Sequence, residues 1–227
     1  LAIDESSDLT LYSHFMDLRG EKAGLEYRYM LDETSKGAVM FDYLYDRQVD
    51  DGTPDSTDKW GYDDDNFRRN NRDRYWFRMK HDHALPNKFM ARLDLDIVSD
   101  QDYLEEFKRG YTGFNETEDY FNEIFNRELD DVNDPIRVNR LNISRYWSNY
   151  ILNTEVRWYD NVILRNRDWI NDFTLQRLPF IGFDGLKQSI LNSPLYFDLD
   201  SEYTYFYSED GTRGNRTDIH PRIYLPY

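Results

Sequence analysis

The sequence contains no cysteine, no long apolar run and comparatively few basic side chains. The absence of cysteine excludes a disulfide scaffold, a Cys-ligated zinc site and a thiol nucleophile. No apolar run approaches the roughly 20 residues that a transmembrane helix needs. Only 28 Lys and Arg are set against 44 Asp and Glu, which gives a formal net charge of −16. This acidic balance argues against a nucleic-acid partner, because phosphate contacts require clustered basic side chains.

Aromatic residues, in contrast, are abundant. The 227 residues include 19 Tyr, 14 Phe and 5 Trp, although the mean hydropathy is only −0.88. Disordered chains of high net charge have few aromatic side chains, so we expect a folded protein. The length is sufficient for one sizeable domain, or for two small ones. Because the chain begins at Leu1, without an initiator Met or a signal peptide, we expect a processed chain or a fragment.

Apolar side chains recur mainly at every second position, which is the period of a β-strand and not of a helix. In residues 89–97 the odd-numbered side chains are apolar and those between them are mainly charged. The same alternation runs through residues 195–207. We therefore predict an all-β protein.

About ten segments share this alternation, and most are ten residues or longer. Strands of soluble domains centre on five or six residues, whereas a tilted strand needs about 9–11 residues to cross a bilayer. The lengths therefore favour an antiparallel transmembrane β-barrel over a soluble β-sandwich. The predicted strands lie near residues 7–17, 24–32, 37–46, 74–83, 89–98, 136–147, 150–159, 171–187, 194–207 and 217–227.

The connections between the predicted strands fall into two alternating sets. Outer-membrane barrels have short periplasmic turns at one end and long extracellular loops at the other. The two longest connections, near 47–73 and 99–135, belong to the same set, so we predict that both are extracellular. The connections of the other set, near 32–36, 84–88, 148–149 and 188–193, are all short.

The second long loop contains one short helical pattern. Within residues 101–129, an apolar stripe is spaced to form one side of a helix. One interpretation is that this stripe packs over the mouth of the barrel. The interpretation that we favour is an ordered loop with a small core of its own. The stripe consists of Tyr120, Phe121, Ile124 and Phe125.

The side chains between the apolar positions are strongly charged, with both signs present. If the apolar faces contact lipid, these side chains line a water-filled lumen, which removes the cost of burying them in a protein core. A soluble sheet with one solvent face would give the same alternation. Tyr and Trp near the predicted strand ends fit the aromatic girdles of a membrane barrel. The predicted luminal residues are Asp8, Thr10, Tyr12, His14, Glu26, Arg28, Asp42, Asp46, Arg78, Lys80, Asp82, Arg92, Asp94, Asp96, Asn153, Glu155, Arg157, Asp198, Asp200, Glu202, Asp218, His220 and Arg222.

No pattern in the sequence indicates an enzyme, a cofactor or a metal site. His81 and His83 share one strand face and can chelate a metal, but no third ligand at a defined spacing accompanies them. Asp94 and Asp96, and a second pair at 198 and 200, resemble the acid and base of a glycosidase. Alternating carboxylates are, however, ordinary on a wet strand face.

Seven short segments, in order along the chain, are similar to those of one family. They are AIDESSDLTLY at 2–12, LRG at 18–20, EYRYM at 26–30, DRYWFRMKH at 73–81, VSDQDYLEEF at 98–107, LQRLP at 175–179 and HPRIYLP at 220–226. Together they resemble the LptD (OstA/Imp) family of lipopolysaccharide-assembly outer-membrane proteins.

The resemblance implies a barrel of about 26 antiparallel strands in the bacterial outer membrane, preceded by a periplasmic β-jellyroll. Residues 1–227 would then be a partial barrel domain from the N-terminal part. It also implies that lipopolysaccharide arrives from a periplasmic Lpt bridge through the jellyroll and leaves between the first and last barrel strands. A lipoprotein plug of the LptE type would fill the lumen. The implied function is lipopolysaccharide transport and insertion into the outer leaflet, in contact with outer-membrane lipid.

On this resemblance, residues 7–17 form one side of a lateral gate. Family members often have prolines in these first strands, which remove ladder hydrogen bonds. Residues 3–16 contain none, so either this gate opens differently or its weakness lies elsewhere. The candidate gate and luminal residues are Asp8, Thr10, Tyr12, His14, Glu26 and Arg28.

Two other interpretations fit parts of the sequence. One is a complete ten-stranded outer-membrane barrel, such as an adhesin or a surface protease. The alternation of Ile219, Ile223, Leu225 and Tyr227 favours it, although Pro226 removes a ladder hydrogen bond there. The other is a secreted, Tyr-rich β-sandwich that binds glycans.

Overall fold

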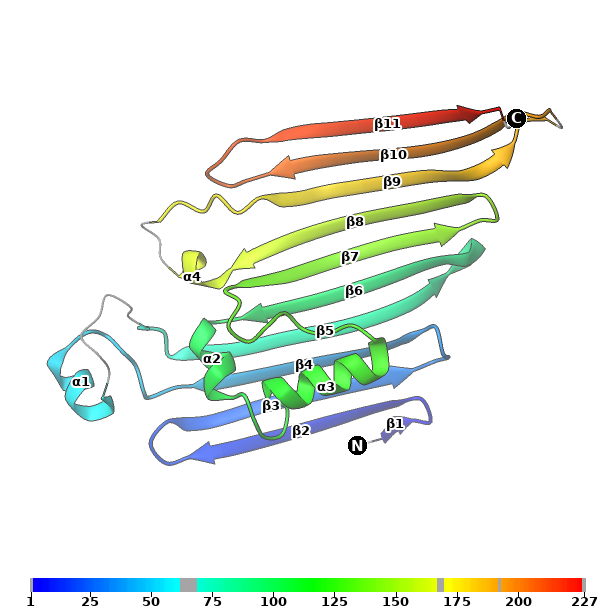
Figure 1. The fold of residues 1–227 in the computed structure, drawn as a ribbon. Coiled ribbons are helices and arrows are strands. Elements are labelled where there is room, and N and C mark those ends of the chain that lie inside the picture. The colour runs from blue at the N-terminus through cyan, green and yellow to red at the C-terminus, as the bar shows by residue number, and fades with distance from the viewer. Residues whose placement is uncertain (1, 62–68, 167–169, 192, 226–227) are drawn as a thin grey trace.

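The computed structural model describes residues 2–61, 69–166, 170–191 and 193–225, which form one antiparallel sheet with short helices (Figure 1). The strands follow one another across the sheet in sequence order, as in an up-and-down barrel. They are β1 (Ala2–Asp4), β2 (Ser7–Met16), β3 (Gly20–Met30), β4 (Lys36–Tyr45), β5 (Asp73–Leu85), β6 (Phe89–Val98), β7 (Ile136–Tyr146), β8 (Tyr150–Asn161), β9 (Gln176–Ser189), β10 (Tyr196–Tyr207) and β11 (Gly214–Tyr224).

The ten predicted strands correspond to β2–β11, and β1 is an additional short strand. The predicted start of β9 was too early by five residues. In that stretch Asp172 Oδ1 accepts a hydrogen bond from the Thr174 amide at 2.8 Å, and such local turns compete with strand pairing. β3 begins earlier than predicted because Gly20, with φ of +128°, permits a tight turn. A Cβ at Gly20 would lie 2.5 Å from the Tyr45 carbonyl oxygen, so no other residue fits.

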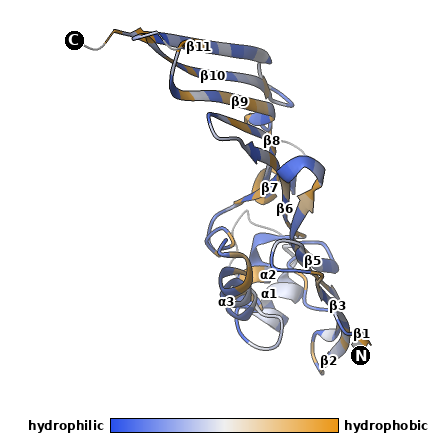
Figure 2. Ribbon diagram, turned by 90° about the vertical axis from the view of Figure 1, so that its right-hand side faces the viewer, coloured by the Kyte–Doolittle hydropathy of each residue, from blue (hydrophilic) through white to orange (hydrophobic). Residues whose placement is uncertain are grey.

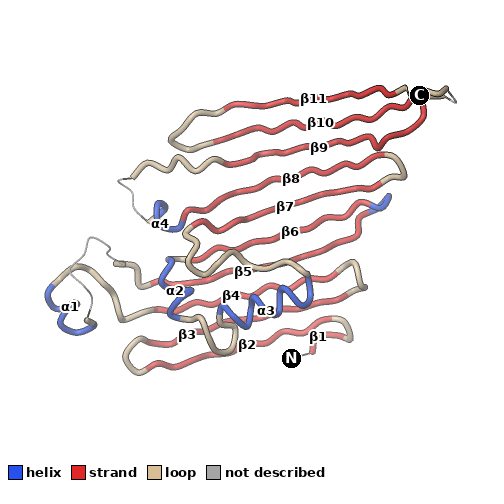
Figure 3. The backbone as a smooth tube through the Cα atoms, viewed as in Figure 1, coloured by secondary structure: helices blue, strands red, loops and turns tan. Residues whose placement is uncertain are grey.

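All long connections lie at one end of the sheet (Figure 3). That end carries α1 (Pro54–Trp60) in the loop after β4, α2 (Gln101–Glu106) and α3 (Phe114–Phe125) in the loop after β6, and α4 (Val162–Arg165) after β8. The turns at the other end are short, and one of them is the 3-10 turn η1 (Pro86–Lys88). The predicted sorting of connections by length is therefore confirmed. That the long-loop end is extracellular stays a prediction.

The strand register aligns the predicted luminal residues on one face of the whole sheet. Asp8 lies opposite Arg28 at one side of the sheet, and Asp198 lies opposite Arg222 at the other. Every pairing between them keeps the same alternation, apart from irregularities in β9 and its neighbours. We call the side with these charges the polar face, and the opposite side the apolar face.

Burial on the two faces is the reverse of that in a soluble protein. Leu11 and Phe15 on the apolar face are 72% and 66% exposed, whereas Arg74, Arg78 and Arg137 are completely buried. A large exposed apolar surface indicates contact with lipid or with another protein.

The sheet remains open, with β1 and β11 at its two edges. The predicted β-sandwich alternative is excluded for the described residues, since all their strands join one sheet. An open, up-and-down sheet is what a segment of a larger barrel would form. Within the described residues, no helix is both long enough and apolar enough to cross a membrane.

The loop 99–135 folds onto the polar face, and α3 has no core of its own. Phe121 and Phe125 pack against Ala38 and Met40 of β4, which interrupt the charges on that face. Figure 2 shows α2 and α3 on the same side of the sheet, beside its N-terminal strands. The favoured interpretation of a private loop core was therefore wrong, because β4 supplies half of the apolar contact.

Replacing Phe121 by Ala should release α3 from β4. The Phe121 side chain is completely buried, and truncation of a buried Phe typically costs about 3–5 kcal/mol. We expect faster amide hydrogen exchange throughout 114–125 in the full-length protein. Asp119→Ala, at an exposed position of the same helix, is the control. Equal protection of α3 in both variants would show that Phe121 does not anchor it.

Candidate functional site

The six candidate gate and luminal residues all lie on the polar face of the first hairpin, β2–β3. Arg28 Nη2 lies 3.0 Å from Asp8 Oδ1, and Arg28 Nε lies 3.6 Å from Glu26 Oε1. The guanidinium thus contacts one carboxylate from each strand. The Arg28 and Asp8 side chains are about 40% exposed, so this pair alone contributes little stability. The six residues are Asp8, Thr10, Tyr12 and His14 of β2, and Glu26 and Arg28 of β3.

Tyr12 and Glu26 contact the loop that follows β6. Thr112 Oγ1 donates a hydrogen bond to Tyr12 Oη at 2.6 Å, and Tyr111 Oη donates one to Glu26 Oε2 at 2.8 Å. The Tyr12 and Tyr111 rings meet edge to face, with centroids 5.1 Å apart. These contacts were not predicted from the sequence, since Tyr12 and Thr112 are 100 residues apart.

Arg78 lies at the centre of the buried part of the polar face. Its Nη1 donates to Asp42 Oδ2 at 3.0 Å and to the Trp76 carbonyl at 3.1 Å, while its Nη2 donates to the Thr112 carbonyl at 2.9 Å. The guanidinium also stacks over the Trp76 ring, 4.0 Å from its centroid. Because Arg78 and Asp42 are both buried, removing either one leaves an unpaired charge in the interior.

A second group of charges surrounds Asp94 of β6. Arg140 Nη2 lies 2.6 Å from Asp94 Oδ2, and Arg127 Nη2 lies 2.9 Å from Asp94 Oδ1. Lys80 Nζ is 3.6 Å from the same carboxylate. A cavity of about 190 Å³ adjoins this group and is lined by acidic and basic side chains. The predicted acid–base candidate Asp94 is therefore paired with cations on several sides.

Asp96 binds a residue that was not predicted for this face. Trp76 Nε1 donates to Asp96 Oδ1, and Arg137 Nε donates to Asp96 Oδ2, both at 2.8 Å. Arg137 also donates to the carbonyls of Asp130 and Asp131. Strict alternation would put Arg137 on the apolar face. β7 still pairs regularly with β8 here, but its pairing with β6 has ended, so Arg137 reaches Asp96 from beyond the β6–β7 ladder.

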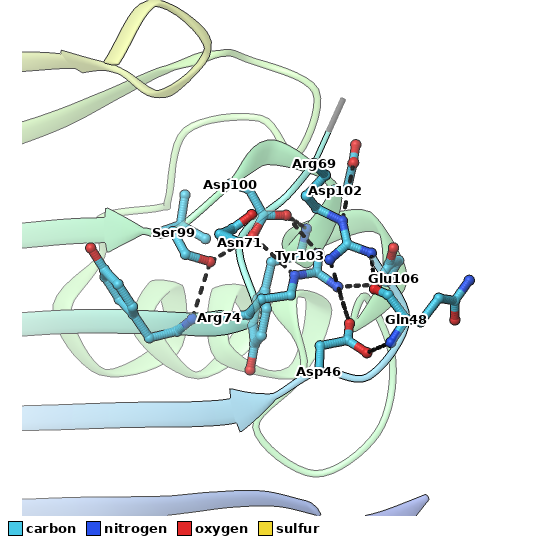
Figure 4. A network of polar contacts seen from close by, with 12 residues as sticks. Asp46, Gln48, Arg69, Asn71, Arg74, Ser99, Asp100, Asp102, Tyr103 and Glu106 are labelled. Carbon is cyan, nitrogen blue, oxygen red and sulfur yellow. Dashed lines mark hydrogen bonds and ion pairs between the residues drawn. The ribbon is translucent and has the colours of Figure 1, made fainter. Parts of the chain in front are cut away.

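Arg74 joins several segments at the long-loop end of the sheet (Figure 4). Its guanidinium donates to both oxygens of Asp100, at 3.0 and 2.6 Å, to Asp46 at 2.9 Å and to Glu106 at 2.6 Å. Arg19, from the turn of the first hairpin, contacts the same Asp46 and Glu106. This cluster fixes β4, β5, α2 and the first turn relative to one another.

Asp100 and Asp46 of this cluster stay ionised despite their burial. Burial alone would raise the pKa of Asp100, but hydrogen bonds and charge attraction from Arg74 outweigh it and hold the pKa below its usual value. Burial likewise opposes ionisation of Asp46, and the hydrogen bonds from Arg19, the Gln48 amide and Arg74 lower its pKa overall.

The predicted histidine pair lies on the apolar face. The His81 and His83 rings stack with centroids 5.7 Å apart, and the Tyr29 hydroxyl contacts His81 Nδ1. In the part of the chain that the structure describes, no three His, Asp or Glu side chains are grouped so as to hold a metal ion.

Replacing Arg74 by Met should strongly destabilise the protein. The side chain is completely buried against several carboxylates, and breaking a buried pair typically costs about 3–5 kcal/mol. Arg216→Met is the matched control, because Arg216 is 62% exposed beside Glu202 and such pairs contribute about 1 kcal/mol or less. Guanidinium unfolding midpoints in detergent measure the stability of both variants. An equally small loss of stability in the two variants would contradict the assigned role of Arg74.

The stability should also depend on Asp100 at acid pH. A lowered folded-state pKa means that the contribution of Asp100 is fully present above the unfolded value of about 4 and is lost as the pH falls through the folded pKa. We expect Asp100→Asn to be less stable than the wild type near neutral pH, and to lose less stability on acidification below about pH 4. Unfolding midpoints measured across this range test it. Parallel pH profiles for the two proteins would show that Asp100 is not responsible.

The comparisons with known proteins agree in pointing to one family. The family model "LptD: LPS transport system D" matches residues 72–227. LPS-assembly protein LptD of Vibrio vulnificus (strain YJ016) is 25% identical over 221 residues, covering 96% of this chain and 23% of the relative. LPS-assembly protein LptD of Pseudoalteromonas atlantica is 26% identical over 228 residues, covering 100% of this chain and 24% of the relative. The chain thus spans about a quarter of the length of these relatives. Since the family model matches well over half of the sequence, the chain belongs to the LptD family.

Proposed function

We propose that this chain is part of an outer-membrane barrel that delivers lipopolysaccharide to the outer leaflet. Membership in the LptD family carries the proposal, since the relatives are named LPS-assembly proteins. The activity belongs to the whole protein, of which relatives contain about four times the length of this chain. No catalysed reaction is part of the proposal, because transport requires only a route and an exit.

The two faces of the sheet suit an amphipathic cargo. Lipopolysaccharide has an apolar acyl region and a phosphorylated sugar region. The apolar face exposes side chains such as Leu11, Val156 and Ile219, at 42–72%, for contact with lipid. The polar face offers water and charges of both signs to the sugar region. On the polar face, pairing of carboxylates such as Asp42 and Asp96 with arginine also reduces the repulsion that they would exert on an anionic cargo.

We place the exit at the edge of β2 that faces away from β3. β2 pairs with β3 at every residue from Ser7 to Met16, whereas β1 pairs with β2 only at Ala2 and Asp4. A short pairing parts more easily than a ladder of ten residues.

The proposal includes an LptE-type lipoprotein plug and a periplasmic Lpt bridge as partners. The loop 99–135 lies over the polar face from β2 to β7 and leaves β10 and β11 uncovered (Figure 2). On β10 and β11, polar-face side chains such as Asp200, His220 and Arg222 remain exposed. This uncovered, polar part of the sheet is where a plug would find contacts.

Photo-crosslinkers at Thr10, Tyr12 or His14 in the intact protein should capture lipopolysaccharide in transit. These positions lie on the polar face of the proposed gate strand. A crosslinker at Asp200, on the same face but eight strands away in the sheet, is the control and should give fewer adducts. Adducts at Asp200 with none at the β2 positions would count against the gate assignment.

A further inference from the structure

The segment 107–113, between α2 and α3, connects the first hairpin to the interior of the polar face. Tyr111 binds Glu26 of β3, and Thr112 binds Tyr12 of β2, through the hydrogen bonds described above. Both strands of the hairpin are therefore attached to a loop that lies more than 80 residues further along the chain.

Gly24 makes the contact between Tyr12 and Thr112 possible. Gly24 lies directly opposite Tyr12 in the register of β2 and β3. A Cβ at this position would overlap the Tyr12 ring and would also approach Asp42 Oδ1 to 2.6 Å. The Tyr12 ring therefore crosses β3 where no side chain obstructs it, and its hydroxyl reaches Thr112.

Thr112 itself has a strained backbone and a rigid anchor. Its φ is +58°, in the left-handed region that a β-branched residue rarely adopts. Its carbonyl accepts a hydrogen bond from Arg78, which is fully buried against Asp42. Thr112 is thus fixed to the interior on one side and to Tyr12 on the other. Such strain persists only where the surroundings over-determine it, and it concentrates at clamps and switches.

We propose that the segment 107–113 is a latch on the lateral gate. The latch is closed when Thr112 binds Tyr12, and it opens when the first hairpin moves away from the lumen and releases the Tyr12 hydroxyl to water. This proposal rests on the proposed function, because it takes β2 as the gate strand. The movement is a bending of the hairpin, which exchanges side-chain hydrogen bonds for bonds to water and leaves the β2–β3 and β3–β4 ladders intact.

The test tethers the latch in the full-length protein in its native membrane. Tyr12→Cys and Thr112→Cys are introduced together and joined by a short bismaleimide, since residues 1–227 contain no cysteine. Met40→Cys with Thr117→Cys is the control pair, because Thr117 Oγ1 lies 3.9 Å from Met40 Sδ and this contact fixes α3 to β4 alone. Single-cysteine variants are treated identically.

We expect the 12–112 tether to abolish lipopolysaccharide delivery and the 40–117 tether to preserve it. Delivery through the 12–112 tether would overturn the latch. Loss of delivery with both tethers would also overturn it, because movement of the whole loop would then be required. A photo-crosslinker at Asn153, on the polar face of β8, tests the proposed function independently of the latch. Absence of adducts at Asn153 and at the β2 positions in the untethered protein contradicts the proposed function itself.

A milder variant tests the same contact without a tether. Tyr12→Phe keeps the ring over Gly24 and removes only the hydroxyl that accepts from Thr112. Loss of one hydrogen bond should accelerate hydrogen exchange in 107–113 by about fivefold. Tyr43→Phe, which removes an exposed tyrosine hydrogen bond to Asp73, is the control. Unchanged exchange in Tyr12→Phe would overturn the latch.

Discussion

The rest of the structure depends on the buried pairing of arginine with carboxylate on the polar face. Arg74, Arg78 and Arg137 have no exposed surface, and each binds a carboxylate from another segment of the chain. Removing such charges from water costs several kcal/mol per ion unless the partner geometry is good. The loop 99–135 supplies at least one oxygen to each of the three arginines. The burial of these arginines therefore depends on the loop, and the path of the loop depends on the strands that carry the arginines.

The loop 99–135 is attached to the polar face by both apolar and polar contacts. The apolar contact of α3 with β4 involves few residues, centred on Phe121 and Met40, and it holds the helix in place. A second apolar cluster joins Tyr103, Phe114 and Val132 of the loop to strand residues such as Trp76 and Val98. The contacts of Tyr111 and Thr112 with the first hairpin are polar, and water can replace a polar contact at a net cost of only about 1 kcal/mol. A loop held in this way keeps its helix on the sheet while a neighbouring segment such as 107–113 changes partners.

Strand positions and loop sorting were predictable because both follow from local patterns. The period of two fixes the faces, and loop lengths alternate along the chain without reference to tertiary structure. Arg137 was missed because it reaches Asp96 from beyond the β6–β7 ladder, where pairing with β6 has ended. The path of the loop 99–135 was mispredicted because its stripe completes a patch on β4, at residues 38 and 40, far away in sequence. The contact of Tyr12 with Thr112 depends on Gly24, which leaves room for the Tyr12 ring. That role cannot be recognised until the strand register is known.

Two Tyr–Gly pairs attach the first hairpin differently on its two faces. On the apolar face, the Tyr29 ring lies over Gly37, its register partner, and reaches His81 of β5 near the short-turn end. At the other end, the hairpin is attached through Arg19, whose ion pairs are partly exposed and are weakened by water and salt. The β3–β4 ladder and the packing of Met16 against the apolar cluster also hold the hairpin at that end, so an outward movement there bends the strands and does not separate them.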